Sequence, residues 1–157
     1  MKYFSIKYLL SIFFIVACLL SSFEGKAQNK NIWRTLAMIK FDMQTGEAND
    51  LVIQKPRTEP MIKAMDGDEV VVKGYIIPLS GKKEQNHFMF SAYPYDSCFF
   101  CGKAGVETVM EVFTKDELKI PYSDEAIYVK GTFKYLGFKP NDVMFSLLDA
   151  RQVDGFD

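Results

Sequence analysis

The residues best suited to chemistry lie in one short stretch of the sequence. Cys98 and Cys101 form a CxxC motif, which lets two sulfur atoms reach one ion from a single turn. His87, the chain's single histidine, precedes the motif, and Glu107 follows it. Thiolate, imidazole and carboxylate groups are the usual ligands of zinc. The pattern predicts that these four side chains bind Zn²⁺ or another transition metal.

The same two cysteines support a second interpretation, thiol–disulfide chemistry. In an oxidising compartment Cys98 and Cys101 can close a local disulfide, either as a redox couple or as a structural bridge. A redox-active CxxC normally opens a helix, whose N-terminus lowers the pKa of the first thiol. Here Gly102 and Gly105 follow, with a predicted strand after them. Gly102 also occupies the position where a haem-attachment motif needs histidine, which excludes c-type haem. Metal site, redox pair and structural disulfide all stay open.

Four aromatic residues surround the motif and form a candidate docking patch for another protein. They are Tyr93, Tyr95, Phe99 and Phe100. Nucleic-acid binding needs a basic excess, and a formal net charge of -1 argues against it. The sequence contains no Walker A motif and no Gly-x-Ser-x-Gly elbow, so we expect no bound nucleotide and assign no catalytic residue. A non-enzymatic binding or accessory protein is favoured, with a metal ion or another periplasmic protein as its partner.

The N-terminus indicates export. Lys2 and Lys7 accompany an uncharged, apolar run over 8–23, which is typical of a signal peptide. We expect cleavage after Ala27, with lipid attachment at Cys18 and a retained anchor as the alternatives. Removing 27 of 157 residues leaves 130, and the loss of three lysines and one glutamate changes the net charge from -1 to -3. The prediction is a periplasmic or secreted protein with no stable membrane span after cleavage.

The rest of the chain reads as a short polar leader over 28–32 and a single domain over 33–157. Predicted strands cover 69–79, 87–93, 106–113, 126–137 and 143–148. The first two form a hairpin, and Gly74 and Gly131 inside strands are typical of a curled sheet. Five strands with little helix predict an all-β fold, a small OB-like, partly open barrel.

The sequence resembles an uncharacterised, domain-of-unknown-function family of exported bacterial proteins. The resemblance rests on Trp33 and on the segments 62–67, 70–79, 129–132 and 145–150. It implies an exported, OB-like protein and no catalytic residue. An association of such proteins with metal-homeostasis transport implies a metal role. The commoner family loop has one cysteine followed by histidine and a proline run, and the CxxC of this chain departs from it.

Overall fold

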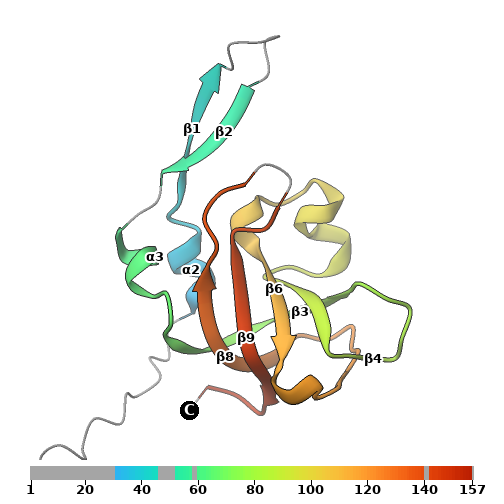
Figure 1. Cartoon of the computed structure of the whole chain (residues 1–157). Helices are drawn as coiled ribbons and strands as arrows, with labels where there is room; N and C mark the ends of the chain where they lie inside the picture. The colour runs from blue at the N-terminus through green and yellow to red at the C-terminus, as the bar shows by residue number, and fades with distance from the viewer. Residues whose placement is uncertain (1–30, 46–51, 58–59, 140–141, 157) are drawn as a thin grey trace, which may run out of the picture.

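Five strands close into a barrel in the computed structural model, which describes residues 31–45, 52–57, 60–139 and 142–156. The strands are β3 (Glu69–Pro78), β5 (His87–Ser91), β6 (Val109–Thr114), β8 (Ile127–Tyr135) and β9 (Phe145–Val153) (Figure 1). Their order around the barrel is β3-β5-β6-β9-β8. The β6–β9 pair is parallel and the other four pairs are antiparallel.

The all-β, five-stranded prediction is confirmed, but the barrel is closed rather than partly open. Residues 69–74 of β3 pair with residues 127–132 of β8, and this pairing joins the first strand to the fourth. Gly74 makes the close packing possible, because a Cβ there would lie 2.5 Å from the carbonyl oxygen of Ser91. The strand order is compatible with the OB-like description, which stays a prediction.

Side chains on the inner faces of the strands form the main core. The largest of them are fully buried and include Phe88, Phe90, Phe133, Phe145 and Met110. Successive side chains of a strand point to opposite faces, so Met89 points out of the barrel between two inward phenylalanines. Met89 belongs to a second, smaller apolar cluster on the outer surface.

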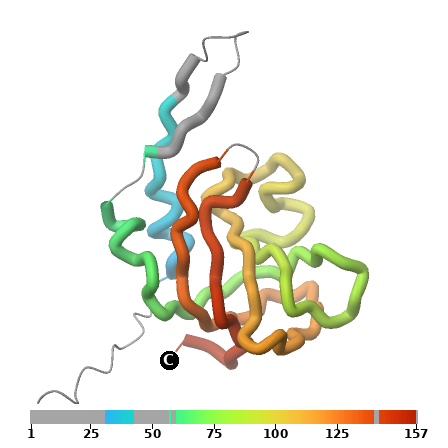
Figure 2. The backbone as a smooth tube through the Cα atoms, viewed as in Figure 1, coloured from blue at the N-terminus to red at the C-terminus, as the bar shows by residue number. Residues whose placement is uncertain are grey.

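Two short helices complete the main core. They are α2 (Ile32–Leu36) and α3 (Pro60–Ala64), which lie on one side of the barrel (Figure 2). Ile32 is 1% exposed, so its assignment to the polar leader is corrected: the folded domain already includes this residue. Trp33 is fixed by a 2.7 Å hydrogen bond from its Nε1 to the carbonyl oxygen of Lys73. No helix within the described ranges is long and apolar enough to cross a membrane.

The remaining elements are short. Strand β1 (Lys40–Thr45) pairs with β2 (Val52–Arg57), and β4 (Glu84–Gln85) pairs with β7 (Ile120–Pro121). Four 3-10 turns, η1 (Tyr95–Ser97), η2 (Phe99–Cys101), η3 (Val106–Thr108) and η4 (Lys115–Glu117), occupy loops. The strand predicted from residue 106 therefore begins at residue 109. The predicted signal peptide over 1–27, with Cys18 and Ala27, lies outside the described residues.

Candidate functional site

The CxxC motif lies in the loop between β5 and β6, which folds back over the outer face of the barrel. Cys98 is fully buried there against the outward side chains of Ile77, Met89 and Val109. A buried free cysteine behaves as a small apolar side chain. Cys98 therefore anchors the loop to the barrel.

Cys101 differs from Cys98 in its surroundings. Its side chain is exposed, and its Sγ donates a hydrogen bond to the carbonyl oxygen of Tyr95 at 3.0 Å. Desolvation raises the pKa of the Cys101 thiol above its ordinary value, and the neighbouring Cys98 thiol raises it further. Turn η2 has only three residues and ends at Gly102, which has a φ of 71°. The motif thus opens no helix that would stabilise a thiolate.

The structure brings the two cysteines together but does not add His87 or Glu107 to them. The Nε2 of His87 lies 2.6 Å from Oε1 of Glu111, and the imidazole stacks on the Phe113 ring. The carboxylate of Glu107 folds back over the backbone of Gly105. Within the described part of the chain, no three His, Cys, Asp or Glu side chains lie where they could hold one metal ion. The two thiols are therefore the only ones of the four predicted metal ligands that the structure brings together.

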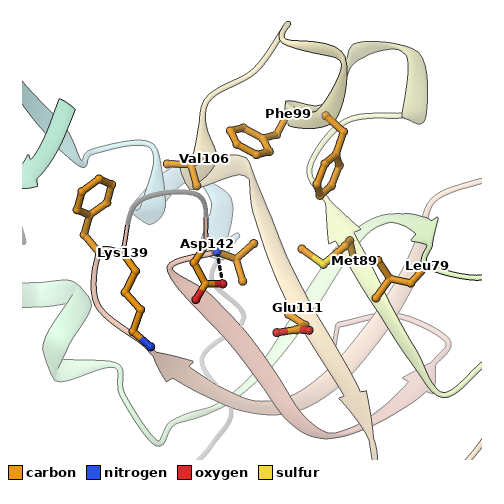
Figure 3. Close-up of a pocket in the computed structure, with 10 residues that line it drawn as sticks. Leu79, Met89, Phe99, Val106, Glu111, Lys139 and Asp142 are labelled. Carbon is orange, nitrogen blue, oxygen red and sulfur yellow. Dashed lines mark hydrogen bonds between the residues drawn. The ribbon is translucent and has the colours of Figure 1, made fainter. Parts of the chain in front are cut away.

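A groove of about 540 Å³ runs beside the CxxC loop on the outer face of the barrel (Figure 3). Seven apolar side chains line it: Leu79, Met89, Phe99, Phe100, Val106, Phe138 and Val143. Three charged residues, Glu111, Lys139 and Asp142, also line it. In Figure 3, Met89 and Glu111 face the hollow from neighbouring strands, with Lys139 and Asp142 on the side of the β8–β9 loop. This size and apolar lining are typical of ligand sites.

The predicted docking residues divide between the groove and other surfaces. Phe99 and Phe100 line the groove, and Phe100 is 51% exposed. Tyr93 and Tyr95 are also exposed, but they line two smaller hollows elsewhere. Sequence reasoning missed the groove residues that come from the β8–β9 loop and from the outer face of β5. The one available signal was Met89, an apolar residue placed out of phase with the inward phenylalanines of its strand.

A family profile described as "Protein of unknown function (DUF3299)" matches residues 20–144. The chain belongs to the DUF3299 family. The predicted resemblance to an uncharacterised family is thereby confirmed. The DUF3299 match spans the CxxC loop and every residue that lines the groove.

One solved structure is similar to this DUF3299 chain. It is the crystal structure of a DUF3299 family protein from Pseudomonas aeruginosa PAO1, which is 21% identical in sequence and has a TM-score of 0.43. The similarity covers 68% of each chain. No curated protein matches the DUF3299 chain.

Proposed function

We propose that this protein is a non-enzymatic binding protein whose groove receives an apolar segment of another exported protein. The observation that carries the proposal is the groove itself, with its seven apolar side chains beside the CxxC loop. Two of them, Leu79 and Phe100, are each about half exposed. Large apolar side chains gathered at one hollow of the surface are typical of binding sites.

The charged residues of the groove favour a peptide segment as the occupant. Glu111 lies among the apolar side chains, whereas Lys139 and Asp142 are exposed. A peptide can fill the apolar floor with its side chains and place its polar backbone or charged groups against residues of both signs. An apolar centre with a polar rim is the usual anatomy of protein–protein interfaces.

A transition-metal role is the second candidate, and only the proximity of the Cys98 and Cys101 thiols favours it. It is tested by purifying the protein without chelator and measuring bound zinc and copper. Stoichiometric metal that Cys98→Ser abolishes would support this role. Metal-free protein with both thiols open to alkylation in denaturant would eliminate it.

The groove proposal is tested by selecting peptides from a random displayed library on the immobilised protein. The affinity of the best peptide is then measured by fluorescence anisotropy for the wild type, Leu79→Asp and Leu118→Asp. The two leucines are matched, because they are 53% and 50% exposed and only Leu79 lines the groove. We expect Leu79→Asp to weaken binding at least about tenfold, which corresponds to about 1.4 kcal/mol. Leu118→Asp should bind like the wild type.

The place of binding is checked independently by amide chemical shifts. The selected peptide should shift the amide signals of Met89, Glu111 and Val143, which lie at the groove. Signals of Ile32 and Ile62, which belong to the two helices, should stay unchanged. Equal binding to both leucine variants, or shifts confined to the helices, would refute the proposal.

A further inference from the structure

The two thiols of the CxxC motif are neighbours, but they differ in their access to solvent. Cys98 is fully buried, whereas Cys101 is exposed. The Cys98 thiol lies near enough to the Cys101 thiol to raise its pKa, and the backbone N–H of Cys101 donates to the carbonyl oxygen of Cys98 at 3.1 Å. The two sulfurs can therefore meet without a large change of the loop, but a reagent in solution reaches only Cys101.

We propose that Cys98 and Cys101 form a reversible disulfide, that exchange enters through the Cys101 sulfur, and that the bridge tightens the groove. The last part rests on the proposed function of the groove. The co-reactant is a disulfide compound, either a small molecule or an exposed disulfide of another protein.

The exchange has two steps. The Cys101 thiolate attacks one sulfur of the disulfide R–S–S–R, which gives a mixed disulfide and releases one RS⁻ that takes a proton from water. Cys98 then gives its proton to solvent and attacks the Sγ of Cys101, which releases the second RS⁻. The protein loses two electrons and two protons, and the co-reactant gains them as two thiols. Reduction by a dithiol runs in reverse and also begins at the exposed sulfur.

In a redox motif that opens a helix, the first cysteine is expected to be the exposed, reactive one. In this loop the second cysteine is exposed and the first is buried in the apolar cluster of Ile77, Met89 and Val109. No helix N-terminus activates the exposed thiol, and the nearby Lys103 lowers its pKa by less than desolvation raises it, so exchange is slow. Slow exchange suits a protein whose redox state is set by its surroundings and then held.

The groove is coupled to the bridge because both residues between the cysteines line it. Phe99 and Phe100 stand edge to face, with ring centroids 5.4 Å apart. The bridge removes the S–H group that Cys101 donates to the carbonyl oxygen of Tyr95, and its S–S bond of about 2.05 Å fixes the turn. A fixed turn loses less conformational entropy when a ligand binds. The oxidised protein should therefore bind apolar ligands more tightly.

The thiol chemistry is tested on the full chain, with Cys18→Ser in every variant so that Cys18 contributes no thiol. The protein is incubated with oxidised glutathione, quenched with an alkylating reagent and weighed by mass spectrometry. We expect the wild-type motif to lose two hydrogens. Cys98→Ala should keep one glutathione on Cys101, and Cys101→Ser should stay unmodified. Absence of the bridge at every glutathione ratio, or equal modification of the two variants, would overturn the proposal.

A second measurement needs no substitution in the motif. The reduced protein is treated briefly with a small alkylating reagent and mapped by peptide mass. Cys101 should be labelled well before Cys98, and equal labelling of a folded sample would contradict the assigned order. Circular dichroism confirms that each sample is folded.

The coupling is tested by titrating 8-anilinonaphthalene-1-sulfonate, an anionic fluorescent probe that binds apolar surfaces, into both redox states. We expect the oxidised protein to bind at least about threefold more tightly, with no redox dependence in Cys98→Ala. Equal affinities in the two states would overturn the coupling. If the probe does not bind the reduced protein and Leu79→Asp leaves the probe affinity unchanged in both states, the proposed function of the groove is refuted. The disulfide is tested separately by the mass measurements.

Discussion

The inner and outer faces of the same three strands, β3, β5 and β6, differ in how completely they are covered. Phe88 and Met89 are neighbours on β5, yet one lies in the closed core and the other lies under a loop. The inner face is enclosed by the barrel together with the helices α2 and α3. The outer face carries apolar side chains that the barrel does not need, and the CxxC loop covers only some of them, which leaves the groove. Apolar residues beyond the needs of the core thus mark the surface for which we propose a binding function.

The strongest test of this difference removes the two neighbouring side chains in turn. Phe88→Ala should cost about 3–5 kcal/mol of unfolding free energy, because it leaves a cavity inside a closed barrel. Met89→Ala should cost about 2 kcal/mol or less, because the outer cluster is small and the loop can settle onto the shorter side chain. Urea denaturation followed by circular dichroism measures both values.

Equal losses from the two alanine variants would show that the outer cluster is as tightly packed as the core. The comparison also requires equal m-values, since a changed m-value signals a changed unfolded or native state rather than lost packing.

A smaller effect is expected from filling the space at a glycine. A Cβ at Gly74 would meet the Ser91 carbonyl oxygen at 2.5 Å and the Phe90 ring at 3.0 Å, whereas nothing lies within 4 Å at Gly81. Gly74→Ala should therefore cost about 1–3 kcal/mol through forced shifts of β3 and β5. Gly81→Ala, in the loop after β3, should cost nothing. Thermal unfolding of the two variants decides the matter, and an unchanged midpoint for Gly74→Ala would contradict the close packing.

The inner face of the barrel could be predicted from the sequence because its signals are local. The β-branched run after the Asp-Gly-Asp turn gave β3, and its hairpin with β5 followed from a short polar connection. The same local signals do not predict where the folded domain begins. The polar neighbours of Ile32 predict a polar segment there, although tertiary contacts bury this residue.

The outer face could not be predicted, because its site is made by contacts distant in sequence. Phe99 and Phe100 line one groove with Phe138 and Val143 only after two loops fold over one face of the barrel. Spacing likewise suggested that His87 joins the cysteines. Its neighbour across the strands is instead Glu111, because β5 and β6 pair with His87 opposite Phe113 and Met89 opposite Glu111.

The pairing of β3 with β8 is stabilised partly by a charged group. The core and the outer cluster, in contrast, are held together by apolar contacts. Asp66, in the turn before β3, accepts a hydrogen bond from the backbone N–H of Tyr135 at 3.0 Å and another from Nζ of Lys134 at 3.2 Å. The Tyr135 N–H, followed by Lys134, holds the pKa of the Asp66 carboxyl below its ordinary value. The charged form is thus favoured by folding.

The smallest expected effect is therefore a pH dependence of stability, which the Asp66 carboxylate confers through its contacts beside the β3–β8 pair. A depressed pKa contributes stability above the unfolded value of about 3.9, and the contribution is lost as the pH falls through the folded value. Asp66→Asn should lower the melting temperature slightly at pH 7, and its difference from the wild type should shrink below about pH 4. Asp68→Asn, in the same turn, removes the same charge and serves as the control. A gap between the wild type and Asp66→Asn that is constant from pH 7 to pH 3 would show that the Asp66 contacts do not depend on its charge. Because no residue of this turn lines the groove, peptide affinity should be the same in Asp66→Asn and the wild type at pH 7.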